Sequence, residues 1–399
     1  MMSVRRGIES LVCFILGTVG VPIASCAGQV GTRVSGATIL AVTNVSGDGR
    51  LLAPTSAIDC GSGVVCLADP RSGLWRLDLV TGAMTLIGRV GEGPGEYRMP
   101  RLALSWIGDT VALWDPALRR VTLFPFGHGR PRVQELASQI ADSLLASVAW
   151  IGTGPQSLTV LSRIAGRSRE SATKVVSAWS VLWQHATSSP RETKVLLSRS
   201  LPRSIIKNTR TMTYRADAPL RPILHAAMLA NGVTWAGVST EREFRRIGPA
   251  GEAMSSVHVV IPQRQAVPSD RNAYRDSILA HFRNEAVELK YGPRVSAEME
   301  DVLRRFLKEV PWPSAAPLWD ILVPADSTIW IGGSGTPGIR SRIWRQFGAN
   351  GGAPIRQVRV PHKWAPIAAI KSGDTLRVLE RSRDGDAFAL VSYLLAPRR

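Results

Sequence analysis

A repeated pattern of polar turns and short β-rich runs is the feature that most constrains how this chain can fold. In the two clearest copies the first run ends in Asp-Pro, at Asp69-Pro70 and at Asp115-Pro116, and these dipeptides lie 46 residues apart. A second apolar run follows each dipeptide after a few residues. A period of roughly this length, with β-rich runs in every repeat, is typical of arrays in which each repeat forms a small antiparallel sheet.

Weaker copies of the pattern extend along the chain and bring the total to six. The paired runs are 63–70 with 74–78, 108–116 with 120–124, 157–162 with 175–182, 231–237 with 243–247, 326–331 with 341–347, and 373–379 with 388–394. A single sheet of this kind cannot bury both of its faces, so the copies must pack on one another. Closing the array into a ring removes exposed sheet edges. The predicted fold is therefore all-β, a six-bladed β-propeller that spans residues 37–396.

Both ends of the chain are expected to contribute to this ring. Residues 37–42 read as one strand, which we expect beside the final strands. One segment breaks the β pattern, because residues 269–309 read as two helices interrupted at residues 292–293. We expect entry at 268–269 and a cap from Ser296 on the second helix. The apolar positions are Tyr274, Ile278 and Phe282 in the first helix, then Met299, Val302, Leu303 and Phe306 in the second. This short insertion is either a cap on the propeller or a lid or docking element.

The N-terminus has the order of features of a secretory signal peptide. Arg5 and Arg6 precede an apolar run over 11–21, and small residues follow at 24–27. We assign residues 1–26 to the signal peptide and 27–36 to a linker. Residues 23–26 resemble a bacterial lipobox, which makes Cys26 a lipidation candidate. Plain cleavage before Gly28 fits the same residues, so both outcomes stay open. The chain is predicted to be exported, as a periplasmic or outer-membrane-anchored lipoprotein or as a secreted protein.

Cysteine usage agrees with export. Cys13 lies in the segment that is removed, and Cys60 and Cys66 remain close together with Gly and Ser between them. A hairpin there would bring the two thiols together, so Cys60 and Cys66 are a disulfide candidate in an oxidising compartment.

The net charge of the chain and the distribution of its arginines indicate which partners to expect. The formal net charge is +18 at pH 7, and the arginines are scattered rather than clustered in a long basic run. A solvated arginine-rich surface accounts for this, and attraction to an anionic membrane surface is the second interpretation. We expect no nucleic-acid partner, because no pattern of arginine and stacking aromatic residues occurs.

The most distinctive stretch is Gly91-Glu92-Gly93-Pro94-Gly95-Glu96-Tyr97. It lacks the Gly-Lys-Ser/Thr ending of a phosphate loop, and a strand rather than a helix follows it, which excludes that function. The residues Gly91, Gly93, Pro94, Gly95, Glu96 and Tyr97 form a structural signature loop. They resemble the Gly-x-Gly-x-Gly-Pro-Gly-Glu-aromatic signature of a bacterial six-bladed β-propeller family with NHL-like repeats. That resemblance implies an exported protein or lipoprotein and implies no catalytic residues.

The sequence contains no recognisable set of catalytic residues. The histidines are His128, His185, His225, His258, His281 and His362, and none has metal-ligand spacing. Asp69 and Asp115 either point into a central channel or, as we favour, bond turns at strand ends. Most tryptophans are expected between blades. We therefore expect a monomeric, non-catalytic binding or scaffold module at the cell envelope, with an unknown protein or glycan ligand and with no catalytic residue, cofactor or metal. The alternative is a channel-mouth enzyme of the lactonase/esterase or quinoprotein type.

Overall fold

The computed structural model describes most of the chain from residue 34 onward. The described residues are 34–45, 51, 54–61, 63–69, 71–93, 95–98, 104–107, 110–115, 118, 120–125, 130–135, 148–153, 157–165, 173–186, 193–208, 213–229, 231–288, 290, 292–325, 327–333, 341–362, 364–382 and 387–395. The predicted signal peptide with Cys26 lies outside them, and so does Pro94 of the signature loop.

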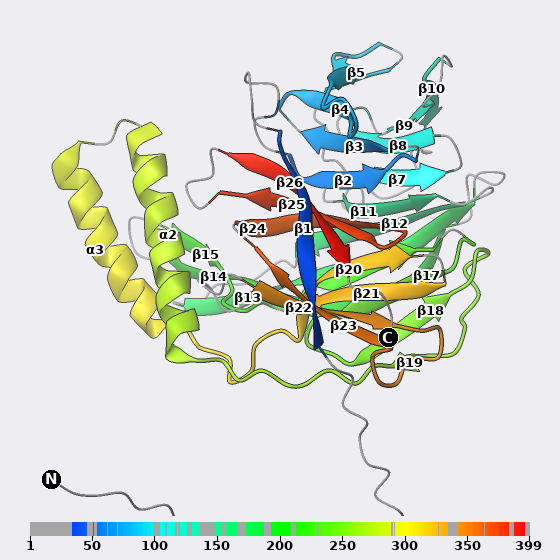
Figure 1. The fold of residues 1–399 in the computed structure, drawn as a ribbon. Coiled ribbons are helices and arrows are strands. Elements are labelled where there is room, and N and C mark those ends of the chain that lie inside the picture. Colours follow the sequence, from blue (N-terminus) through cyan, green and yellow to red (C-terminus); the bar gives the residue numbers. More distant parts are fainter. Residues whose placement is uncertain are drawn as a thin grey trace, which may run out of the picture. The chain divides into compact units, whose positions relative to one another are not determined.

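The described strands form six antiparallel groups, called blades 1 to 6 in chain order (Figure 1). Blade 1 holds β2 (Ser56–Asp59), β3 (Val64–Asp69), β4 (Gly73–Asp78), β5 (Met84–Val90) and the short β6 (Glu96–Tyr97). Blade 2 holds β7 (Leu104–Ile107), β8 (Thr110–Asp115), β9 (Arg120–Pro125) and β10 (Arg132–Glu135). Blade 3 holds β11 (Val148–Thr153), β12 (Ser157–Ala165), β13 (Thr173–Ala186), β14 (Thr193–Asn208) and β15 (Thr213–Asp217).

The other blades follow the same order. Blade 4 holds β16 (Leu224–Met228), β17 (Thr234–Val238), β18 (Glu243–Ile247) and β19 (Val257–His258). Blade 5 holds β20 (Trp319–Ala325), β21 (Thr328–Gly333), β22 (Ser341–Phe347) and β23 (Arg356–Pro361). Blade 6 holds β24 (Ala365–Ser372), β25 (Thr375–Arg381), β26 (Phe388–Leu395) and β1 (Val34–Asn44). Each of the six sequence copies corresponds to the second and third strands of one blade.

The first strands of the blades form a closed series of contacts. β2 contacts β7, and the contacts continue through β11, β16 and β20 to β24, which returns to β2. A closed series of this kind places each blade between two neighbours. The predicted six-bladed β-propeller is therefore confirmed.

The N-terminal strand closes the ring, as predicted. β1 pairs antiparallel with β26 from Ala37 to Asn44, and its first residues pair parallel with β23 of blade 5. β1 begins at Val34, three residues before the predicted start of the propeller. These added residues join blades 5 and 6 into one eight-stranded sheet.

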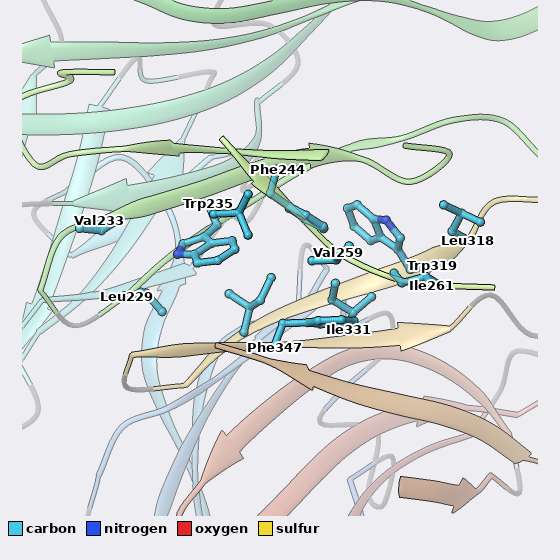
Figure 2. Packing of buried hydrophobic residues seen from close by; sticks show 12 residues of the cluster. Leu229, Val233, Trp235, Phe244, Val259, Ile261, Leu318, Trp319, Ile331 and Phe347 are labelled. Carbon is cyan, nitrogen blue, oxygen red and sulfur yellow. The ribbon is translucent and has the colours of Figure 1, made fainter. Parts of the chain in front are cut away.

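Apolar side chains fill the space between neighbouring blades. In the contact between blades 4 and 5, the rings of Phe244 and Trp319 stack with centroids 5.2 Å apart, and Trp235 lies beside Phe244 (Figure 2). Trp330 and Trp344 are buried in the contact between blades 5 and 6. The prediction that tryptophans pack between blades is confirmed for these four residues.

The helical insertion lies between blades 4 and 5 in the chain, as predicted. It consists of α2 (Pro268–Glu288) and α3 (Pro293–Glu309). Its apolar side packs around Phe306 and Leu303, together with Ala218 at the end of blade 3. At the entry, the Asp270 carboxylate accepts a hydrogen bond from the backbone N–H of Val267 at 3.0 Å.

One detail of the insertion was predicted wrongly. Ser296 does not cap α3, because the helix begins at Pro293 and Gly292 is its N-cap. Proline is well suited to the first helical position, since its φ angle is fixed near the helical value and it has no N–H to satisfy. Ser296 lies inside the helix, and its backbone N–H bonds to the Gly292 carbonyl at 3.0 Å.

Candidate functional site

One end of the propeller carries the most varied connections. Strand direction alternates within a blade, so the turn from second to third strand emerges at the same end as the connection to the next blade. We call this end the long-loop face. It carries the signature loop after β5, the α2–α3 insertion after β19 and His362 after β23. Connections of this kind, presented by a rigid scaffold, are where proteins most often place binding residues.

The signature loop is held together by Glu96. Its Oε2 accepts a hydrogen bond from the Gly93 backbone N–H at 2.8 Å, and its Oε1 accepts one from Nε of Arg89 at 2.8 Å. These bonds lower the pKa of the Glu96 carboxyl, with the backbone bond as the largest cause. A Cβ atom at Gly91 would lie against the Glu96 carboxylate, which explains the glycine there. Glu96 therefore bonds local backbone.

Tyr97 connects the same loop to blade 1. Its side chain is fully buried, its hydroxyl accepts the Leu74 backbone N–H at 2.8 Å, and it donates to the Gly88 carbonyl. Burial raises the pKa of this hydroxyl well above its usual value. Arg120 of blade 2 donates to the Gly93 and Glu96 carbonyls, each at 2.8 Å. The described part of the loop thus joins blades 1 and 2.

Asp69 and Asp115 occupy the same repeat position, the last residue of the second strand, and both are fully buried. Asp69 Oδ1 accepts the backbone N–H of Arg71 at 2.7 Å. Asp115 accepts those of Leu118 at 3.2 Å and of Arg98 at 2.6 Å. The structure supports the interpretation that they bond turns over the interpretation that they point into the channel.

Glu380 holds the equivalent position in blade 6, near the end of β25, and it is also fully buried. Its longer side chain makes different contacts. Oε1 lies 2.7 Å from Nδ1 of His362 and 2.8 Å from the Tyr393 hydroxyl, and Oε2 accepts the Trp364 backbone N–H at 3.0 Å. We call Trp344, His362, Glu380 and Tyr393 the His362 cluster.

The hydrogen bonds of the cluster fix the protonation of His362. The indole Nε1–H of Trp344 donates to His362 Nε2 at 3.4 Å, so this nitrogen is an acceptor and the proton lies on Nδ1. Nδ1–H then donates to Glu380. Burial raises the pKa of the Tyr393 hydroxyl, and the neighbouring Glu380 carboxylate raises it further. All four side chains are buried, so the cluster supports the surface above it rather than contacting a ligand.

A half-buried ion pair lies at the same face of blade 5. Arg342, near the start of β22, donates to Oδ2 of Asp320, near the start of β20. The side chains are 17% and 32% exposed. Burial raises the pKa of Asp320, while the neighbouring Arg342 guanidinium opposes that change. Oδ1 of Asp320 is itself buried and has no hydrogen-bond partner among the residues that the structure describes, so the exposed part of this side chain lies elsewhere.

The cysteine pair lies at the opposite end, in the turn from first to second strand of blade 1. The Cα atoms of Cys60 and Cys66 are 6.1 Å apart, and the structure pairs their sulfur atoms. Gly61 and Gly63 adopt positive φ angles of 77° and 76° in this turn, which glycine tolerates best. The geometry permits the disulfide, whose formation in the cell stays a prediction. Cys26 lies outside the described residues.

Sequence reasoning missed the His362 cluster. Its members lie on three strands and one connection and match no known motif, so only the packing of blades 5 and 6 brings them together. One signal was present, because Glu380 replaces the aspartate found at the same repeat position in blades 1 and 2. Within the described ranges, no group of three or more His, Cys, Asp or Glu side chains is arranged to hold a metal ion. No described helix is long and apolar enough to cross a membrane.

Blades, ring and turns together define the chain as a β-propeller protein. Comparison with family models finds no match, and comparison with curated proteins finds none either. Similar solved structures include a member of the duf4221 family from Bacteroides vulgatus, with a TM-score of 0.46 at 6% identity over 90% of this chain and 97% of that one.

Two further solved structures are similar at the same level. Regucalcin from Agrobacterium tumefaciens, described as a calcium-binding protein, has a TM-score of 0.41 at 11% identity, over 91% of this chain and 97% of its own. The β-propeller domain of Cps50 (Swd1) from Myceliophteria thermophila has a TM-score of 0.39 at 9% identity, over 89% and 99%. Similarity at this level carries no inference about ligand or activity.

Proposed function

We propose that this chain is an exported, non-catalytic propeller that binds a protein or glycan of the cell envelope through its long-loop face. The proposal rests on a difference between the buried carboxylates, which bond the protein itself, and one ion pair that is partly exposed. Asp69, Asp115 and Glu380 all bond the framework, whereas the neighbouring Asp320–Arg342 pair is partly exposed. A rigid frame under an accessible ion pair is suited to recognition.

The chemistry of the pair favours a ligand rich in hydrogen-bond donors and acceptors. The partly exposed Asp320 side chain offers a carboxylate acceptor to amide, amine or hydroxyl groups, and the Arg342 guanidinium offers donors to carbonyl or carboxylate oxygens. Proteins and glycans both supply such groups. The α2–α3 insertion starts from the same face and adds surface beside the end of blade 3.

Export and membrane anchoring form part of the proposal. They rest on the signal-like order of residues 1–26, on Cys26 in its lipobox-like setting, and on the cysteine pair at 60 and 66. The signature loop keeps its resemblance to the exported NHL-like six-bladed family, and this supports the same compartment. Determination of the N-terminus and lipid content of the chain isolated from bacterial envelopes tests this part directly.

The binding proposal is tested by comparative capture from envelope extracts and by a glycan array. The probe is the whole exported chain, beside the double variant Asp320→Asn, Arg342→Gln. The matched control is Arg132→Gln, an exposed arginine at the other end of blade 2. We expect a ligand that the unmodified chain and the control bind and that the double variant loses. Equal binding by all three proteins would place the site elsewhere.

The alternative, a channel-mouth enzyme, predicts a different outcome. Hydrolysis of lactones or esters, or reduction of an electron acceptor by a quinone-loaded chain, would favour it. Activity that survives the double variant but fails on substitution of other channel-mouth residues would replace the binding proposal.

A further inference from the structure

The rim of blade 6 exposes an unusual group of apolar side chains. Ile39, Leu40 and Val42 of β1 are 51%, 53% and 60% exposed. Exposed apolar residues are normal when they occur singly, but a contiguous group on one strand marks an interaction site. We call these three residues the β1 patch.

Register places the β1 patch on one side of the blade. Ile39 lies opposite Tyr393 and Val42 lies opposite Val391, and these partners are two positions apart on β26 and so share a face. Leu40 is the extra residue of the irregularity between Ile39 and Ala41. Tyr393 and Val391 belong to the core between blades 5 and 6. The β1 patch therefore continues that core outward, to where no described blade covers it.

The position of the β1 patch in the chain identifies its occupant. Val34 begins β1 eight positions after Cys26. Eight residues of fully extended chain reach at most about 28 Å. If Cys26 carries an acyl anchor, the rim of blade 6 is the part of the propeller that the linker holds nearest to the bilayer.

Charge points to the same occupant. The whole chain is strongly basic, with a formal net charge of +18. Exposed apolar side chains on a basic protein are a combination that binds anionic membrane interfaces.

We infer that the β1 patch docks the propeller on an anionic lipid surface. The inference rests on the proposed export of the chain. In this arrangement the rim of blade 6 contacts the membrane, and the long-loop face stays free to bind the ligand. Apolar insertion and electrostatic attraction then add to a single acyl chain, which by itself gives only weak, reversible attachment.

The test uses the exported chain purified with Cys26→Ser, so that no lipid anchor contributes. Its binding to vesicles of phosphatidylglycerol and phosphatidylethanolamine is measured by co-sedimentation, with phosphatidylcholine vesicles for comparison. We expect binding to the anionic vesicles that falls roughly tenfold in Ile39→Ser, Leu40→Ser, Val42→Ser, because apolar burial and charge act together.

The control replaces three exposed apolar residues of blades 1 and 3, as Val80→Ser, Leu86→Ser, Val195→Ser. It should bind as the unmodified chain does, and all variants should keep the same melting temperature. Equal vesicle binding by the β1 triple variant overturns the inference, and so does a dimer in solution that only this variant disrupts. Retention of the chain in the cytoplasm overturns both the export proposal and this inference. If the chain is exported but does not bind the vesicles, the lipid-docking inference is wrong and the export proposal stands.

Discussion

Glu380 accepts a hydrogen bond from Nδ1 of His362 at 2.7 Å, and both side chains are buried. His362 follows the last strand of blade 5, and Glu380 lies on the second strand of blade 6. The bond therefore joins the closing blade to its neighbour, under the edge of the long-loop face. Its partners Trp344 and Tyr393 come one from each blade.

Glu380→Gln should lower the free energy of unfolding by about 1–3 kcal/mol. The amide NH₂ cannot accept, so either the Trp364 backbone N–H or the donors at Oε1 lose their partner. Urea unfolding measures the change. Glu298→Gln, an exposed acid on α3, is the control and should stay within about 0.5 kcal/mol of the unmodified chain. An equal effect of both substitutions would mean that the His362 cluster adds nothing to closure.

Tyr97→Phe should weaken the attachment of the signature loop to blade 1. The substitution keeps the ring but leaves the buried Leu74 N–H and Gly88 carbonyl without the hydroxyl, which costs about 1–3 kcal/mol. Thermal or urea unfolding reports the loss. Glu92→Gln, exposed in the same loop, serves as the control. A melting temperature unchanged in Tyr97→Phe would contradict the role given to this hydroxyl.

The cysteine pair should be oxidised in the exported chain. Alkylation before reduction should leave Cys60 and Cys66 unmodified in the mass spectrum, and reduction should expose both. The variant Cys60→Ser, Cys66→Ser should lose about 2 kcal/mol of stability, as expected for a crosslink that closes a short loop. Full alkylation of both thiols in protein taken from the envelope would refute the disulfide.

The α2–α3 contact should weaken in acid. Arg283 of α2 donates to Glu300 of α3 at 2.7 Å and 2.9 Å, and together with Arg304 it lowers the pKa of Glu300 to about 2. A carboxyl whose pKa is lowered on folding stabilises the folded state above its ordinary pKa, near 4.5, and loses that contribution as the pH falls towards 2.

Amide exchange of α2 and α3, followed from pH 5 to about pH 2, measures this loss. Protection of the helices should fall over that range in the unmodified chain. Glu300→Gln should reduce the pH dependence, because it removes the titrating group. Helices whose protection is independent of pH in both proteins would show that this ion pair does not hold the hairpin together.

The sequence predicted the architecture because the repeat is a local property. Each copy contains its own turn residues and two alternating strands, so the copies around Asp69 and Asp115 are visible without any knowledge of the ring. The break at residues 292–293 likewise separates the two helices. The cap of α3 was predicted wrongly, because a serine inside the helix was preferred over the proline that begins it.

The candidate site was largely invisible for a physical reason. The His362 cluster and the Asp320–Arg342 pair form only when strands and connections of blades 5 and 6 pack at one end of the ring, with the partners 13 to 22 residues apart in the chain. A histidine on a connection and a glutamate and a tyrosine on two strands form no recognisable motif. The β1 patch was also hidden, because its residues read as an ordinary buried strand until register and exposure were known.

In-cell photo-crosslinking tests the central claim, that the long-loop face binds an envelope partner, most directly. A crosslinking amino acid is placed on that face at Thr240, exposed in a turn, or at Arg381, exposed at the end of β25. At the opposite end it is placed at Val80 or Ala250, both exposed in turns. Mass spectrometry then identifies the adducts. We predict a shared adduct from the first two positions that is absent from the other two. Adducts formed only from Val80 and Ala250, or equally from all four positions, would contradict the account.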